Sequence, residues 1–220
     1  MVEQPRALYT LDGATGSRRR ELVEQLPQDG FVVVRGMPSR YQEINGLLTP
    51  KAQSLTQGID FNPDSIKKLP TSDARVIADL ATEVIIVQHD EAVRLMQEGN
   101  TVFIESSVLR LINSFWVAWS EAERNGDNER ARISYDMIER AKSAVPLVDT
   151  VTGFVLISDV YRDGDSYGIF RGYEDMESSY LRRTVQEISR TQGFPVCQLN
   201  PNTSSLKEQR AKIRKFVTKP

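Results

Sequence analysis

The sequence predicts an α/β fold in which a mostly parallel, five-stranded sheet carries helices on both faces. Short apolar, β-branched runs alternate along the chain with amphipathic helical stretches, and turns rich in glycine, proline and asparagine separate the two. The chain has 220 residues, which is enough for one domain with a substantial core. We therefore expect a single domain over residues 1–220.

The expected strands are the short apolar runs at 8–11, 31–34, 101–104, 152–157 and 194–199. Apolar residues at helical spacing predict helices over 21–26, 41–48, 73–99, 109–125, 128–145, 176–188 and 206–217.

Three further expectations concern the helices and their connections. Asp73 is the expected N-cap of its helix. Residues 84–87 are four β-branched residues that alone would favour a strand. The apolar residues on both sides of them keep the spacing of a helix, so we assign residues 84–87 to that helix. The segments 49–72 and 161–172 are rich in breaking or polar residues, and we expect them to be mobile.

Composition limits the possible functions. A net charge of −2 argues against a protein that binds nucleic acid through bulk electrostatics. The one cysteine, Cys197, cannot form a disulfide framework within the chain, which fits a reducing compartment. The one histidine, His89, cannot supply the two histidines of an oxygenase facial triad, so we expect it at the surface or in helix packing. A Ser-His-Asp hydrolase stays open, but no G-x-S-x-G elbow is present.

Hydropathy gives no sign of a membrane protein. No apolar run reaches the roughly 18 residues that a membrane span needs, and the first residues lack the apolar region of a signal peptide. We therefore expect a cytoplasmic protein without membrane contacts.

Residues 12–20 follow the first expected strand and are typical of a phosphate-binding loop whose end is altered. Such a loop has the pattern G-x-x-x-x-G-K-[ST], which lets backbone amides surround a polyphosphate. Counted from Gly13, the spacing is kept, but Arg18, Arg19 and Arg20 stand where the pattern has Gly, Lys and Ser/Thr. The alternative is a common glycine turn followed by solvated arginines.

Ligands of parallel sheets bind at the carboxyl ends of the strands. In this chain those ends carry the segments 12–20, 35–38, 105–107 and 161–171, which contain most of the candidate charges. We expect the site at this edge.

With these segments in this order, the chain resembles the thymidylate kinase and deoxynucleoside kinase branch of the P-loop kinases. Residues 12–16 resemble the opening of the family's phosphate loop, and 33–36 resemble its second strand. Residues 102–107 resemble its third-strand signature, with Ser106 in place of the arginine. Residues 162–171 resemble its arginine-bearing lid. Thymidylate kinases keep a base-reading arginine near the position of Ile86, so that contact is expected to be lost.

The resemblance implies binding of ATP and Mg²⁺ and phosphoryl transfer to a deoxynucleoside or its monophosphate. It implies the following cofactor-binding residues: Gly13, Ala14, Thr15, Gly16, Ser17, Arg18, Arg19 and Arg20. It implies these catalytic residues: Arg19, Glu105, Arg162 and Arg171. Arg35 and Ser107 would bind substrate, and Glu105 and Ser17 would hold the metal, because Arg20 lacks a hydroxyl.

Two other functions remain open at this level. The altered motifs are also compatible with a catalytically degenerate, kinase-derived protein that binds a nucleotide or another anion without transferring phosphate. A structural or interaction protein that uses the fold only as a scaffold is the third possibility. The family resemblance also suggests a homodimer.

Overall fold

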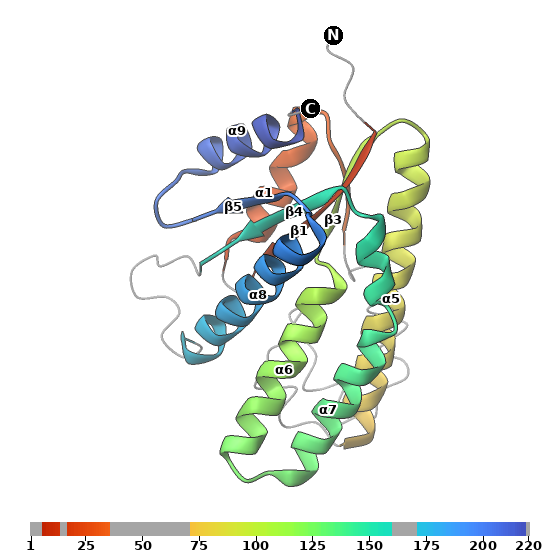
Figure 1. Cartoon of the computed structure of the whole chain (residues 1–220), viewed down its shortest axis with the longest axis vertical. Helices are drawn as coiled ribbons and strands as arrows, with labels where there is room; N and C mark the ends of the chain where they lie inside the picture. Colours follow the sequence, from red (N-terminus) through yellow and green to blue (C-terminus); the bar gives the residue numbers. More distant parts are fainter. Residues whose placement is uncertain (1–5, 14–16, 36–70, 160–170, 219–220) are drawn as a thin grey trace.

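The structure, a computed structural model, describes residues 6–13, 17–35, 71–159 and 171–218 (Figure 1). Its strands are β1 (Ala7–Gly13), β2 (Val32–Val34), β3 (Thr101–Glu105), β4 (Gly153–Ile157) and β5 (Val196–Leu199). Its helices are α1 (Arg19–Gln25), α5 (Thr71–Gln97), α6 (Val108–Arg124), α7 (Asn128–Lys142), α8 (Arg171–Gln192) and α9 (Leu206–Val217). Two 3₁₀ helices are η1 (Leu26–Asp29) and η2 (Val145–Thr150).

The strands form one sheet in the order β2-β3-β1-β4-β5, and every pairing is parallel. The predicted five-stranded parallel sheet is therefore confirmed. After β1 the chain crosses toward β2, whereas after β3 it crosses in the opposite direction toward β4. The crevice at such a switch point, outside the carboxyl ends of β1 and β3, is where open α/β sheets bind ligands.

Helices cover both faces of the sheet, as predicted. The helices α1 and α9 lie on one face, and α5, α6, α7 and α8 lie on the other (Figure 1). Successive side chains of a strand point to opposite faces of the sheet, so each strand contributes to both cores. In β1, Leu8 faces the layer of α5, α6, α7 and α8, whereas Tyr9 and Leu11 face α1 and α9. The two cores hold the carboxyl ends of β1 and β3 in a fixed position.

Several local predictions need correction. The helix α5 begins at Thr71, so Asp73 lies inside it and is not its N-cap. Residues 84–87 are helical, as predicted. The helix α7 ends at Lys142 instead of 145, and a separate 3₁₀ turn follows because Pro146 at its start cannot continue an α-helix. The predicted helix at 41–48 lies outside the described residues.

The two expected mobile segments also lie largely outside the described residues. Of the segments 49–72 and 161–172, the structure describes only the last two residues of each, and these are helical.

Three charged residues fasten the C-terminal helix to the rest of the domain, and we call them the helix clamp: Asp29, Arg210 and Arg214. Arg210 donates from Nε and Nη2 to the two carboxylate oxygens of Asp29 at 2.7 and 2.8 Å. Arg214 donates from Nη1 to Asp29 Oδ1 at 2.7 Å. The Asp29 side chain is 3% exposed, so this short, bidentate geometry satisfies a buried carboxylate.

Candidate functional site

The two described ends of the turn after β1 are both backbone positions that favour glycine. A Cβ added at Gly13 would lie 2.6 Å from Ser17 Oγ and 3.1 Å from Ile157 Cβ, so no larger residue fits there without rearrangement. Arg18 adopts the left-handed conformation, with φ 59°, and α1 begins at Arg19. The backbone therefore keeps the glycine conformation of the pattern at Arg18, at a strain of about 1–3 kcal/mol.

The first and third arginines of the run turn toward carboxylates of their own helix. Arg18 donates to both carboxylate oxygens of Glu21, from Nε at 2.8 Å and also from Nη2. This hydrogen bond lowers the pKa of Glu21. Arg20 is 75% exposed and lies 3.7 Å from Glu24 along the outer side of the helix. Among the hydrogen bonds between described residues, Arg19 is the one of the three arginines that reaches the carboxyl end of β1.

Two guanidinium groups converge on the carbonyl of Gly13. Arg19 Nη1 donates to Gly13 O at 2.9 Å, and Arg110 Nε donates to the same oxygen at 3.0 Å. Arg19 comes from the start of α1, and Arg110 from the first turn of α6. Both side chains are mostly buried, with 16% and 23% of their area exposed. The carboxyl end of β1 therefore carries two cations side by side.

Three carboxylates surround these cations. Glu105 Oε1 lies 3.7 Å from Arg19 Nε, and Glu177 Oε1 lies 3.7 Å from Arg110 Nε. Asp12 is fully buried at the end of β1, and the Asp12 charge also acts on Arg19. We call these five residues the loop cluster: Asp12, Arg19, Glu105, Arg110 and Glu177.

The cluster perturbs the acidity of Arg19. Burial, and then the like charge of Arg110, lower the pKa of the Arg19 guanidinium to about 10, while Glu105, Asp12 and Glu177 oppose that shift. Arg19 stays protonated at neutral pH, but its charge is poorly solvated. A buried cation of this kind interacts strongly with any anion that reaches it.

Within the described part of the chain, the cluster contains polar atoms that no hydrogen bond satisfies. Asp12 Oδ1 accepts from the Ser107 amide at 2.7 Å, but Asp12 Oδ2 is buried without a partner. Arg19 Nε and the Ser17 hydroxyl are likewise buried without a hydrogen bond. Such groups cost free energy, and a bound ligand is one way to satisfy them.

The other sequence-predicted residues are placed less centrally. Ser107 is the N-cap of α6, and its hydroxyl accepts from the Leu109 amide at 3.2 Å. Arg35 directly follows β2 and is exposed. Arg171 is the first residue of α8. The remaining predicted residues lie outside the described residues, and these are Ala14, Thr15, Gly16 and Arg162.

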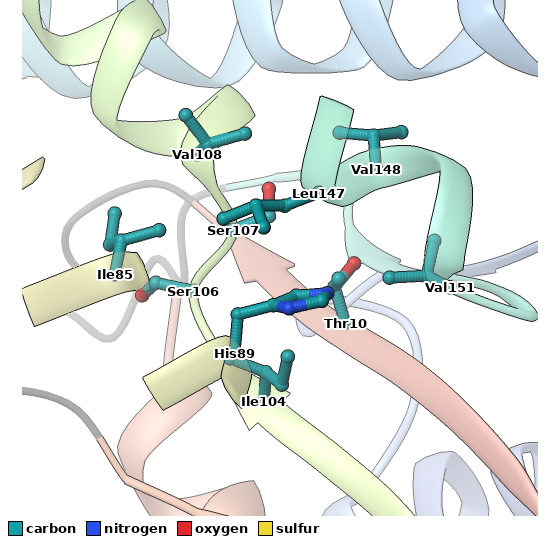
Figure 2. Close-up of a pocket in the computed structure, with 10 residues that line it drawn as sticks. All are labelled: Thr10, Ile85, His89, Ile104, Ser106, Ser107, Val108, Leu147, Val148 and Val151. Atoms are coloured by element: carbon teal, nitrogen blue, oxygen red, sulfur yellow. The ribbon is translucent and has the colours of Figure 1, made fainter. Parts of the chain in front are cut away.

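A small apolar hollow lies on the other side of the turn from β3 to α6 (Figure 2). Its walls are aliphatic: Ile85, Ile104, Val108, Leu147, Val148 and Val151. Its polar margin consists of Thr10, His89, Ser106 and Ser107. The cavity volume of the hollow is about 20 Å³, which is room for little more than one water molecule and far too small for a substrate.

His89 joins α5 to η2 beside this hollow. Figure 2 shows its ring extending from α5 toward Thr10. The Thr150 hydroxyl donates its one proton to the Leu147 carbonyl at 2.8 Å, so it accepts from His89 Nε2 at 2.6 Å. The expectation of a helix-packing histidine is confirmed, and the surface alternative is wrong, because His89 is 5% exposed.

Sequence reasoning missed two members of the loop cluster, Arg110 and Glu177. A signal for Glu177 exists, because it lies four residues before Leu181 and eight before Val185, on the apolar stripe of α8. A carboxylate on a buried stripe needs a cationic or hydrogen-bonding partner. Arg110 carries no such signal, because an arginine in the first turn of a helix is common at protein surfaces.

The part of the chain that the structure describes has no helix long and apolar enough to cross a membrane. It also contains no group of three or more His, Cys, Asp or Glu side chains that could hold a metal ion by themselves.

Comparisons with known proteins support the fold. No family model and no curated protein sequence matches the chain. Among solved structures, it is similar to a NadR protein in complex with NR, with a TM-score of 0.53, 11% identity and 97% of this chain covered. It spans about half of that protein, or 52% of its length. It is also similar to thymidylate kinase from Candida albicans, with a TM-score of 0.52, 10% identity, and 97% of this chain and 91% of that one covered. The chain therefore has the fold of the P-loop kinases.

Proposed function

We propose that this chain is a nucleoside or nucleoside-monophosphate kinase that transfers a phosphoryl group from ATP. One observation carries the proposal: at the switch point of a P-loop kinase fold, Arg19 replaces the loop lysine and faces Glu105 from the end of β3. The position, the charge and the opposing carboxylate are those that phosphoryl transfer requires.

Arg19 would supply the positive charge. During transfer, the bond between the γ-phosphorus and the oxygen that leaves with ADP breaks, and a bond from phosphorus to the acceptor oxygen forms. That oxygen belongs to the hydroxyl of a nucleoside, which releases its proton to solvent, or to the phosphate of a nucleoside monophosphate. Catalysis of this step is mostly positioning and charge neutralisation. Arg19 is buried and held by the Gly13 carbonyl, so its guanidinium is already oriented before phosphate arrives. A guanidinium presents its donors as a planar fork that matches two phosphate oxygens, whereas a lysine acts as a compact point charge.

The residues present fit a magnesium ion. Mg²⁺ in kinases is held by one or two carboxylates together with substrate phosphates and water, so a closed cage of protein ligands is not needed. Glu105 would hold it, and the Ser17 hydroxyl, buried and without a hydrogen bond to any described residue, would replace the hydroxyl that Arg20 lacks. The ion would neutralise phosphate charge.

The family's other predicted contacts belong to the same proposal. Arg162 and Arg171 would neutralise charge on ATP. Arg35 and Ser107 would bind the acceptor. The proposed homodimer and cytoplasmic location rest on the resemblance and on composition, respectively.

A second function, nucleotide or anion binding without transfer, is favoured by a specific observation. Arg20 points to solvent beside Glu24, so the position that normally supplies a metal-binding hydroxyl contributes nothing to the site. If Ser17 does not replace it, the loop would bind phosphate through Arg19 but would lack one metal ligand.

ADP formation in the presence of Mg²⁺, ATP and a panel of nucleosides and nucleoside monophosphates tests the proposal. We expect turnover with one or more acceptors and at least a hundredfold lower kcat/KM in Arg19→Gln. The matched control is Arg20→Gln, which removes the neighbouring exposed arginine and should leave kcat/KM unchanged. Folded protein that binds ATP without turnover across the panel would favour the second function, and no binding of ATP or of inorganic tripolyphosphate would contradict both.

A further inference from the structure

We propose that Arg110 is a second phosphate-binding residue of this site, which acts with Arg19 as a pair of guanidiniums flanking the Gly13 carbonyl. The inference rests on the proposed function and extends it, because no sequence motif assigns a role to Arg110. The ligand class is an oligophosphate, such as the triphosphate of a nucleotide.

The geometry leaves donors available on both arginines. Each guanidinium has five N–H groups. Arg19 uses Nη1 for the Gly13 carbonyl, and Arg110 uses Nε for the same oxygen. Among the described residues, Nη2 of Arg19 and both Nη groups of Arg110 donate no hydrogen bond. Because both arginines bind the Gly13 carbonyl oxygen, their unused donors lie beside the carboxyl end of β1.

The charge arrangement also calls for an anion. Two guanidiniums that share an acceptor repel each other, and this repulsion is costly where water is partly excluded. The neighbouring carboxylates relieve it only in part: Glu105 and Glu177 each lie 3.7 Å from the nearest arginine nitrogen, beyond hydrogen-bond distance. An oligophosphate could place oxygens between the guanidiniums at hydrogen-bond distance from both.

Glu177 holds Arg110 in this position without neutralising it through a direct hydrogen bond. Glu177 is 1% exposed, and its Oε1 accepts from the Ser114 hydroxyl at 2.8 Å. Ser114 lies one helical turn after Arg110 on α6, and Glu177 lies on α8. The carboxylate therefore fixes the side of α6 on which the Arg110 side chain lies, and we assign Glu177 a positioning role.

The end of β3 itself supplies no cation at this point. Ser106 has a left-handed backbone with φ 79° and lines the apolar hollow on the far side of the turn. Glu105 is the opposing carboxylate of Arg19. Among the described residues, Arg110 supplies positive charge on this side of the crevice, from the first turn of the following helix.

A purely structural role for Arg110 makes different predictions. If its function were only to hold the Gly13 carbonyl, Arg110→Gln would change thermal stability and would leave the affinity for free phosphate compounds unaffected once the protein is folded. If it binds phosphate, affinity falls while the folded fraction stays constant. Arg110→Lys keeps the charge but loses the planar fork, so its affinity should lie between those of wild type and Arg110→Gln.

Calorimetric titration of the full chain with inorganic tripolyphosphate tests the inference. We expect the wild type to bind tripolyphosphate, and we expect the affinities of Arg110→Gln and Arg19→Gln to be lower by about tenfold or more. The affinity of Arg110→Lys should lie between those of the wild type and Arg110→Gln. The control Arg124→Gln removes an exposed arginine from the far end of the same helix and should bind like the wild type. Circular dichroism at the titration temperature checks that each variant is folded.

The outcomes separate this inference from the proposed kinase activity. Equal tripolyphosphate binding by wild type and folded Arg110→Gln, or no binding by the wild type, overturns the role of Arg110. ADP formation by the wild type then still decides the kinase proposal. Arg110-dependent tripolyphosphate binding without ADP formation supports the inference and counts against phosphoryl transfer.

Discussion

The loop cluster and the helix clamp both join two arginines to carboxylates that are mostly buried, but they are built differently. In the helix clamp, three hydrogen bonds of 2.7–2.8 Å connect two arginines to one carboxylate. In the loop cluster, the arginines bind a backbone carbonyl, the carboxylates lie 3.7 Å away, and Asp12 Oδ2 and Arg19 Nε lack hydrogen bonds within the described residues.

This difference separates a structural ion pair from a candidate site. A clamp that is complete in itself stabilises the folded state and has no need of a ligand. A cluster with unsatisfied atoms lowers stability, and proteins keep such arrangements mainly where function requires them. We therefore expect changes in the helix clamp to affect unfolding, and changes in the loop cluster to affect binding and turnover.

The largest expected effect is the loss of function in Arg19→Gln. The side chain is the cation of the loop, so kcat/KM should fall by about a hundredfold or more. The midpoint of thermal unfolding should stay the same or rise, because a poorly solvated charge is removed. Steady-state kinetics and thermal melts on the same preparation measure both. A lower melting temperature with unchanged kcat/KM would mean that Arg19 stabilises the fold and takes no part in catalysis.

The converse is expected for Asp29→Asn in the helix clamp. It leaves Arg210 and Arg214 without their carboxylate, and the free energy of unfolding should fall by about 2 kcal/mol, less than for a fully buried pair because Arg214 is half exposed. Tripolyphosphate affinity should be unchanged. Urea unfolding measures the first and calorimetry the second. Glu187→Gln, which breaks an exposed pair with Arg190, is the control and should have no measurable effect.

A smaller effect should appear in the pH dependence of stability. Hydrogen bonds from Arg210 lower the pKa of Asp29, so its contribution is full above about pH 3.8 and is lost as the pH falls through its folded pKa. Burial lowers the pKa of His89 below 6.5, so the loss from His89 begins as the pH falls below 6.5.

Urea unfolding at several pH values separates the two contributions. His89→Gln, which does not titrate, should flatten the curve just below pH 6.5 only, and Asp29→Asn should flatten it below pH 3.8 only. An unchanged curve in His89→Gln would mean that His89 is solvated in the folded protein.

The smallest expected effect is that of Ser17→Ala. It removes a buried hydroxyl that makes no hydrogen bond to any described residue, so the unliganded protein should change stability by less than about 1 kcal/mol. Affinity for ATP should fall a few-fold with Mg²⁺ present and should be unaffected with Mg²⁺ chelated. Equal affinities for wild type and Ser17→Ala with Mg²⁺ present would exclude Ser17 as a metal ligand.

The sequence predicted all five strands of the sheet but only part of the loop cluster. The strands could be predicted because each is a short, mostly apolar run between breaking turns, and the three central strands are almost wholly buried. Arg19 and Glu105 could be predicted because Glu105 ends β3 and Arg19 begins the helix after β1, where a motif specifies the residue types. Arg110 and Glu177 could not, because their roles depend on how α6 and α8 rotate about their axes, which packing and not local sequence decides.

The helix clamp could not be predicted from local sequence either. Asp29 and Arg210 are about 180 residues apart in the sequence, and nothing in either local pattern connects them. Likewise, the start of α5 at Thr71 could not be placed from Asp73, because aspartate is also common within the first turn of a helix, where it interacts favourably with the helix dipole.

The most direct test of the central claim is a crystal structure of the chain with Mg²⁺ and a non-hydrolysable ATP analogue. We expect triphosphate oxygens within hydrogen-bond distance of the guanidiniums of Arg19 and Arg110, with Glu105 on the metal side of the phosphates. A triphosphate bound elsewhere, with both arginines still on the Gly13 carbonyl alone, would contradict the account.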